Sequence, residues 1–243
     1  MIIILIKLIA AHIIGDFALQ PDRLCDMRYG NNPSKRVIAN CIHSLIQAIL
    51  SYCLIGIWNL WILPIIIFFS HFIIDLIKTV YGKRKLPDFI LDQAAHYCVI
   101  FIIWYFFLSR LPATETISRI SQTGWIMLTS YAAILKPTSI LVKSFMEYNS
   151  WIPNIPSLQG LPNAGKWIGY LERILILTFI FTDNIEGIGF LLAAKSIFRF
   201  GELNQSKDIK VTEYVLIGTF LSFTIAILIG FMGKWMMTIG TEL

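Results

Sequence analysis

All four histidines of this chain lie in apolar segments, and three of them are four residues away from an aspartate. The pairs are His12 with Asp16, His71 with Asp75, and His96 with Asp92, and the fourth histidine is His43. Residues four apart share one face of a helix, so each pair points an imidazole and a carboxylate in one direction. Ionisable groups are costly in apolar surroundings and usually mark function there. These side chains are therefore the first candidates for a functional site.

Imidazoles and carboxylates together form the ligand set that suits Zn, Mn and Fe. The pattern predicts a divalent metal cofactor, Zn before Mn or Fe, and the candidate ligands are His12, Asp16, His43, His71, Asp75, Asp92 and His96. This number exceeds one tetrahedral site. The residues could therefore serve one ion with outer carboxylates, or two ions about 3.5–4 Å apart.

The same residues allow two other interpretations. Each aspartate could simply neutralise its own histidine inside the apolar segment. A pair of histidines could instead bind haem, although axial histidines do not require an aspartate on the same face of each helix.

The composition predicts an integral membrane protein. Of 243 residues, 56% are hydrophobic and 14% are charged, and the mean hydropathy is +0.70, which is typical of a multi-span protein. The net charge of +5 is spread over several loops, so a nucleic-acid partner is not expected. The cysteines lack metal-type spacing and are expected to be reduced core residues: Cys25, Cys41, Cys53 and Cys98. The first apolar run lacks a basic start and a cleavage motif, so it is expected to be a retained span.

Apolar runs predict an all-α polytopic bundle of about 7–8 spans, with the metal-type site in the first four helices. The runs lie at about 2–19, 37–57, 58–77, 88–109, 125–146, 167–182, 186–200 and 212–233. Lys136-Pro137 makes the fifth run irregular, and the polar break at 182–184 predicts a hairpin of the sixth and seventh. The predicted domains are a His/Asp-bearing bundle over 1–148, a Pro/Asn/Gly-rich linker over 149–166, and a three-helix membrane part over 167–243.

Clusters of lysine and arginine follow the first, third and seventh runs, which predicts that these loops are cytoplasmic and that the N-terminus is outside. The expected location is the bacterial cytoplasmic membrane. In this orientation every histidine lies roughly 10–12 Å inside the cytoplasmic helix ends, and the aspartates lie roughly 5–6 Å inside. The candidate ligands therefore form one layer across four consecutive spans.

The later runs carry a second group of polar residues. Arg173, Lys195 and Arg199 approach the same predicted side as the histidines, and they could bind the phosphate or carboxylate of a substrate. Basic residues at cytoplasmic helix ends are also expected from topology alone. Small residues in these runs are expected to permit close helix packing: Gly187, Gly189, Gly218 and Ser222.

Three motifs stand out in the front part: His12-Ile-Ile-Gly-Asp16-Phe, His71-Phe-Ile-Ile-Asp75 and Leu91-Asp92-Gln-Ala-Ala-His96. Three more occur in the rear part: Gly169-Tyr-Leu-Glu172-Arg173, Ala194-Lys195-Ser-Ile-Phe-Arg199-Phe and Ile217-Gly218-Thr219. In these motifs the chain resembles an uncharacterised family of bacterial multi-span membrane proteins, domain of unknown function 3307. The resemblance implies no established activity. The pattern is more loosely similar to predicted membrane-bound metal-dependent hydrolases.

These observations favour a metal-dependent membrane hydrolase acting on a lipid-like ester or phosphoester. Asp16, Asp75 and Asp92 are the candidate catalytic residues, and Arg173, Lys195 and Arg199 are the candidate substrate-binding residues. The alternatives are a metal-ion or proton-coupled transporter and a non-catalytic structural membrane protein. The expected partners are the lipid bilayer and a lipid-like substrate.

Overall fold

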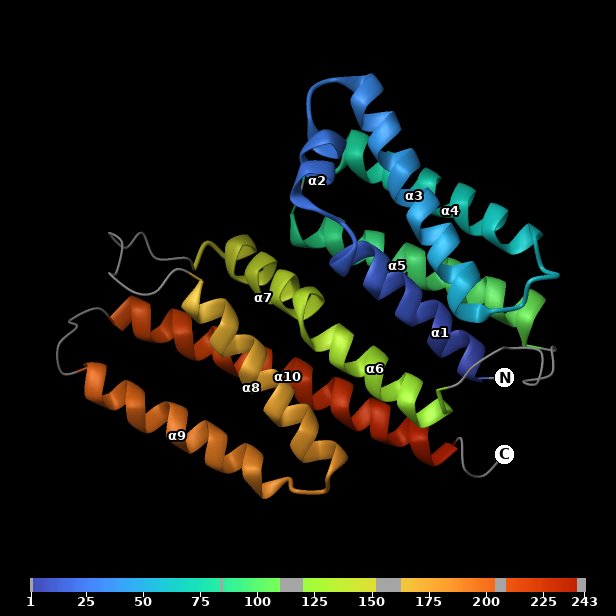
Figure 1. The fold of residues 1–243 in the computed structure, drawn as a ribbon. Helices are drawn as coiled ribbons and strands as arrows, with labels where there is room; N and C mark the ends of the chain where they lie inside the picture. The colour runs from blue at the N-terminus through green and yellow to red at the C-terminus, as the bar shows by residue number, and fades with distance from the viewer. Residues whose placement is uncertain (1, 84, 110–119, 152–162, 204–208, 240–243) are drawn as a thin grey trace. The chain divides into compact units, whose positions relative to one another are not determined.

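The computed structural model describes residues 2–83, 85–109, 120–151, 163–203 and 209–239, and it leaves the side chains of 198–210 undescribed. Most of the described residues are helical, and none of them forms a strand (Figure 1). The chain divides into two compact units, Met1–Ala132 and Ala133–Leu243. The predicted all-α fold class is confirmed.

The first unit is built around a bundle of four helices: α1 (Ile2–Ile13), α3 (Pro33–Ile55), α4 (Ile62–Tyr81) and α5 (Leu86–Ile103). Helix α1 packs against α3 and α5, and α4 packs against the same two helices. Consecutive helices are therefore neighbours around the bundle (Figure 1), as short connections favour.

Two π-helical turns, one short helix and most of α6 (Gln122–Ile134) complete the first unit. Helix α1 continues into the π-turn η1 (Ile14–Ala18), and the chain then bends by 84° into α2 (Asp22–Tyr29). Helix α5 likewise continues into the π-turn η2 (Trp104–Leu108). Figure 1 shows α2 beside the start of α3. We call this end of the bundle, which also carries the α4–α5 turn, the α2 end.

The bundle is polar inside and apolar outside in the half near the α2 end. On α3, for example, Asn40, His43 and Gln47 are buried, whereas Leu45 and Ile49 are half exposed. The other half of the bundle has an apolar core that includes Ile4, Leu8, Ile55, Leu63 and Ile67. A surface of large apolar side chains is costly in water but suits a helix that faces lipid. The arrangement supports an integral membrane protein.

The second unit contains the end of α6 (Gln122–Ile134) and four further helices: α7 (Lys136–Tyr148), α8 (Ala164–Phe181), α9 (Glu186–Leu203) and α10 (Ile209–Ile239). The division between units falls within α6. Helix α10 packs against α7 and α8, and α9 packs against α8. The predicted irregularity near Pro137 is a break between α6 and α7 at Leu135, whose φ is −81° and ψ is −110°. The predicted hairpin is formed by α8 and α9.

Five helical stretches of the described chain are long and apolar enough to cross a membrane, and η1 with α1 and α2 gives a sixth if that bent pair is one span. The stretches are Pro33–Ile55, Ile62–Tyr81, Leu86–Leu108, Gln122–Tyr148 and Val211–Ile239. Helices α8 and α9 do not qualify, since each carries more than two charged residues within 18 positions. The multi-span character is confirmed, whereas eight spans of this quality are not found. The 149–166 linker lies largely outside the described residues, so the predicted domain boundaries stay a prediction.

Two smaller predictions are wrong. Cys41, Cys53 and Cys98 are exposed on the outer faces of the first unit rather than buried in its core, and all four cysteines are free thiols. In the second unit, the prediction of close packing is wrong only for Gly189 and Gly218, which have open space where a Cβ would lie; at Gly187 a Cβ would be 3.0 Å from the Phe179 ring, and Ser222 is buried. Close packing of α10 on α8 occurs instead at Gly230, where a Cβ would be 2.6 Å from Ile180.

Candidate metal centre

The four histidines meet inside the first unit, and each comes from a different helix of the bundle. The ring centroids of His71 and His96 are 4.0 Å apart, those of His12 and His96 are 5.0 Å apart, and those of His43 and His71 are 5.0 Å apart. All four rings are buried, none of them with more than 5% of its surface exposed. Four separate helices therefore each direct one imidazole to the same place inside the bundle.

The aspartates lie among these rings at distances that suit shared metal coordination. The Oδ1 atom of Asp16 is 3.2 Å from Nε2 of His43 and 3.4 Å from Nε2 of His71. The Oδ2 atom of Asp75 is 3.4 Å from Nε2 of His71. Two ligand atoms bound at about 2.1 Å to one tetrahedral ion are about 3.4 Å apart, whereas N–H···O hydrogen bonds cluster near about 2.9–3.0 Å. Most of the separations in this cluster are compatible with two ligands of one ion.

Several of the same atoms are buried without a hydrogen-bond partner among the described residues. They are Nε2 of His71, Nε2 of His96, Oδ2 of Asp75 and Oδ1 of Asp92. A buried polar atom without a partner is rare because its desolvation is not offset. Four such atoms in one cluster are compatible with a further group, such as a cation, bound among them.

Three overlapping groups of side chains bring one ligand atom each to within 4.8 Å of one another. They are His12 with His71 and His96, Asp16 with His43 and His71, and Asp75 with Asp92 and His96. The three groups together contain all seven residues predicted from the sequence to be metal ligands. The first group offers nitrogen donors, and the other two offer both nitrogen and oxygen donors. These donor types bind Zn, Mn and Fe.

Asp16 lies on the π-turn η1, whose wider winding is often found at functional sites. Gln47 of α3 donates hydrogen bonds from Nε2 to Asp16 Oδ1 at 2.5 Å and to the backbone carbonyl of His12 at 3.2 Å. Gln93 of α5 donates to the other carboxylate oxygen of Asp16 at 3.2 Å. Gly15 permits this arrangement, because a Cβ there would lie 2.4 Å from the Gln47 amide. Two amides and a glycine thus fix the orientation of this carboxylate.

The other two aspartates are each held by a basic side chain. An Arg28 guanidinium nitrogen lies 2.5 Å from Oδ1 of Asp75, and the Lys78 ammonium lies 2.5 Å from Oδ2 of Asp92. In both cases the opposite carboxylate oxygen is the one without a hydrogen-bond partner. Each ion pair therefore uses one oxygen and leaves the other directed at the histidines. Asp16 is held by amides and imidazoles and makes no ion pair with lysine or arginine among the described residues.

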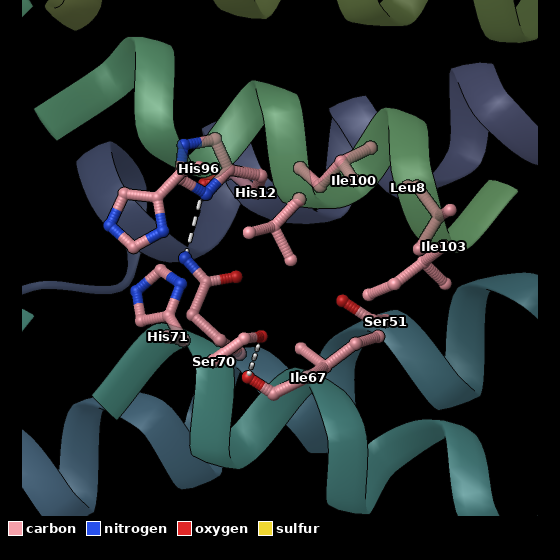
Figure 2. Close-up of a pocket in the computed structure, with 11 residues that line it drawn as sticks. Leu8, His12, Ser51, Ile67, Ser70, His71, His96, Ile100 and Ile103 are labelled. Atoms are coloured by element: carbon pink, nitrogen blue, oxygen red, sulfur yellow. Dashed lines mark hydrogen bonds between the residues drawn. The ribbon is translucent and has the colours of Figure 1, made fainter. Parts of the chain in front are cut away.

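A small cavity adjoins the imidazoles of His12, His71 and His96 (Figure 2). Its volume is about 20 Å³, and about 10–15 Å³ on this measure is needed for one water. The cavity extends away from the α2 end, between Ile67, Ile100 and Ile103, and Ser51 and Ser70 also line it. It has room for a water-sized species beside the cluster and none for a haem.

The predicted substrate-binding residues belong to the second unit. Arg173 is buried and donates hydrogen bonds to the carbonyl of Ile134 and to the hydroxyls of Ser139 and Ser222. Lys195 forms an ion pair with Glu172 at 2.7 Å. The side chain of Arg199 lies outside the described residues. The role of these three residues in binding a substrate stays a prediction.

Sequence reasoning missed several residues of the centre. Arg28 is close to the loops whose basic residues predict topology, and nothing in its spacing indicates that it points inward. Lys78 could have been found, because it follows His71 by seven residues and Asp75 by three and so shares their helix face. Gln47 and Gln93 could have been found, because Gln47 is four residues after His43 and Gln93 is three before His96. On α3 the buried polar residues form a continuous stripe: Asn40, His43, Ser44, Gln47 and Ser51.

Comparison with known proteins agrees with the predicted family for the part of the chain that builds this centre. Residues 4–124 belong to a family described as protein of unknown function (DUF3307). The match contains every histidine and aspartate of the cluster. It does not extend to the rear motifs around Arg173, Lys195 and Gly218. No curated protein and no solved structure matches the chain significantly.

Proposed function

We propose that the first unit binds a catalytic divalent metal ion and that the protein is a metal-dependent membrane hydrolase of a lipid-like ester or phosphoester. The observation that carries the metal site is the combination of ligand-like N···O separations, 3.2–3.7 Å, with buried unpartnered donor atoms. Zn fits the mixed imidazole and carboxylate set best, and Mn and Fe use the same ligands.

The cavity supports a catalytic ion over a purely structural one. Structural zinc sites are closed by protein ligands, whereas catalytic sites keep one position open for water or substrate. The space beside His12, His71 and His96 provides such a position. A metal ion at such a site supplies hydrolytic chemistry by lowering the pKa of bound water from 15.7 to about 7.

Asp16 is the best placed of the three candidate catalytic carboxylates to exchange protons. Its side chain is 10% exposed, against 2% for Asp75 and Asp92. The other two carboxylates are each bound to a cation, which suits them to orient ligands rather than to accept a proton. We therefore assign proton transfer to Asp16 and positioning to Asp75 and Asp92.

The membrane setting indicates the substrate class. The cluster is enclosed by helices whose outer faces are apolar, for example at Phe69, Ile73 and Ile77 of α4. A substrate that reaches this centre from the bilayer would have to be lipid-like. Arg173, Lys195 and Arg199 remain candidates for binding its head group. The proposed location is the bacterial cytoplasmic membrane.

Transport of a metal ion is the second candidate, and one observation favours it. The three ligand groups overlap at His71 and His96, so an ion could pass from one group to the next, and the hydroxyls of Ser51 and Ser70 line the adjoining cavity. The lining beyond these hydroxyls is aliphatic, however, with Leu8 and Ile103. A path for a divalent ion would need further polar groups there, so hydrolysis is the proposal we prefer.

Elemental analysis of the full chain, purified in detergent, tests the metal site directly. We expect stoichiometric Zn, Mn or Fe in the wild type and loss of the metal in a His71→Ala, His96→Ala double variant, with Asn59→Ala as the matched control in an exposed turn. Metal-free wild-type protein would remove the proposal.

Turnover then separates the two functions. The metal-loaded protein is expected to hydrolyse a generic ester or phosphodiester, and the double variant is expected to lose this activity. The same preparations in proteoliposomes are expected to show no metal flux. Flux without turnover would instead support the transporter.

A further inference from the structure

The Arg28 and Lys78 side chains carry two positive charges in direct contact with the proposed metal ligands. Arg28 reaches Asp75 from α2, and Lys78 reaches Asp92 from the last turns of α4. Only 3% of Arg28 is exposed. This burial distinguishes it from exposed basic side chains at the same end, such as Lys83.

Arg28 is held in place by a chain of contacts from three helices. Its Nε donates to Oδ1 of Asn40 at 2.7 Å, and Asn40 in turn donates to Oγ1 of Thr79 at 2.9 Å. Thr79 donates back to the backbone carbonyl of Asp75 at 2.9 Å. A guanidinium is charged at every pH that a folded protein meets. The bundle therefore contains a fixed cation beside Asp75, rather than a mobile surface charge.

The charge balance of the cluster then limits how many metal ions it can hold. Three carboxylates against one guanidinium and one ammonium leave a formal charge of −1 when the imidazoles are neutral, as metal ligands must be. One divalent ion changes this to +1, which a single anionic ligand from solvent or substrate neutralises. Two divalent ions would give +3. Unbalanced charge is very costly in a buried apolar setting.

We propose that Arg28 and Lys78 take the place of a second divalent cation, so that the centre binds one ion and both side chains act as positioning residues. This inference rests on the proposed metal site. Of the three ligand groups, Asp16 with His43 and His71 is the one whose carboxylate makes no ion pair with a lysine or arginine among the described residues. The single ion is therefore placed in that group, with His12 and the cavity beside it. Asp75 and Asp92 orient the imidazoles around it through their unpaired oxygens.

The number of bound ions tests this inference. The full-length wild type, saturated with Zn²⁺ or Mn²⁺ and then freed of excess metal, is expected to hold one ion per chain. An Arg28→Met, Lys78→Met double variant is expected to hold two, because its second carboxylate group is released. Lys78→Arg keeps the charge and is expected to stay at one ion. Lys83→Met, an exposed change at the same end, is the matched control and is also expected to stay at one.

Separate outcomes distinguish this inference from the proposed function. Two ions in the wild type, or one ion in the folded double variant, would overturn the inference and leave the metal site intact. Absence of any bound ion in the wild type would overturn both. If the double variant does not fold, Lys78→Met alone is expected to bind Mn²⁺ at least tenfold more tightly than the wild type. Unchanged affinity in that variant rejects the inference.

Discussion

Gly15 is the residue whose size matters most to the geometry around Asp16. Its missing side chain leaves the space that the Gln47 amide occupies between α3 and η1. Gln47 in turn links Asp16 to the backbone of His12. One small residue thus lets an amide on a neighbouring helix orient the carboxylate that we place nearest the metal.

A Gly15→Ala variant is expected to displace Gln47 and to weaken both stability and metal binding. The added Cβ would approach three amide atoms of Gln47 to 2.4–2.5 Å, and overpacking of this kind costs about 1–3 kcal/mol. Loss of a residue that orients a ligand reduces metal affinity by about 10–100-fold. Thermal unfolding and metal titration measure the two effects. Gly189→Ala, at a site with open space, serves as the control, and equal behaviour of the two variants would contradict this role for Gly15.

The elements that carry the centre were predictable in kind but not in detail. Helical periodicity predicts that His71 and Asp75 share a face, and both do point into the bundle. The π-turn at Asp16 was not predictable, since its winding depends on how Gln47 and Gln93 pack against it. The same holds for Arg28, which enters the cluster only because the chain bends by 84° between η1 and α2. The local spacing of residues is enough to predict which of them share a helix face. Such bends depend instead on contacts between residues that are distant in the sequence.

The break between α6 and α7 is a second feature of the helices that depends on a distant side chain. At Leu135 the helix is interrupted before Pro137, which cannot donate a backbone hydrogen bond. The Ala133 carbonyl thereby loses its helical donor and accepts from the Thr138 hydroxyl instead. Arg173 donates to the carbonyl of Ile134 and, at 3.5 Å, to that of Leu135, which also accepts from the backbone N–H of Ser139. The buried guanidinium thereby stabilises the interrupted helix with donors from a neighbouring helix, α8.

An Arg173→Met variant is expected to destabilise the second unit, because removing the guanidinium leaves the Ile134 carbonyl and the Ser139 and Ser222 hydroxyls without this donor. A buried group left unsatisfied costs about 1–3 kcal/mol. Arg173→Lys is expected to rescue only in part, since an ammonium cannot match the planar array of donors. Thermal unfolding in detergent measures both, and Lys143→Met, which breaks only an exposed pair, is expected to leave the midpoint unchanged. An unaltered midpoint in Arg173→Met would show that the break needs no such donor.

On the scale of the whole molecule, the first unit joins a polar interior to an apolar exterior. Composition alone predicts the membrane class, because so many apolar residues exceed what one soluble core can bury. Composition could not separate lipid-facing from buried cysteines, since Cys41, Cys53 and Cys98 occupy apolar runs whose two faces look alike in sequence. Charges within α8 and α9 likewise prevent the apolar runs from being counted directly as spans.

The difference in charge between the two ends of the first unit predicts its orientation in the membrane. The α2 end carries a concentration of basic residues that includes Arg23, Lys35, Arg36, Lys83 and Lys85, whereas the α3–α4 turn around Asn59 has none. Basic loops are retained on the cytoplasmic side. The α2 end is therefore expected to face the cytoplasm. The aspartates and the proposed metal centre lie closer to this end than to the other.

Labelling of single cysteines tests this orientation in intact cells. The four native cysteines are first replaced by serine. None of them belongs to the ligand groups of the cluster, so these replacements remove no contact of the cluster. A cysteine at Asn59 is expected to react with a membrane-impermeant maleimide from outside, and one at Lys83 only after the membrane is permeabilised; both positions are exposed. The reverse pattern would place the α2 end outside. It would also require the substrate and metal of the proposed centre to arrive from that side, since the carboxylates lie within two helical turns of it.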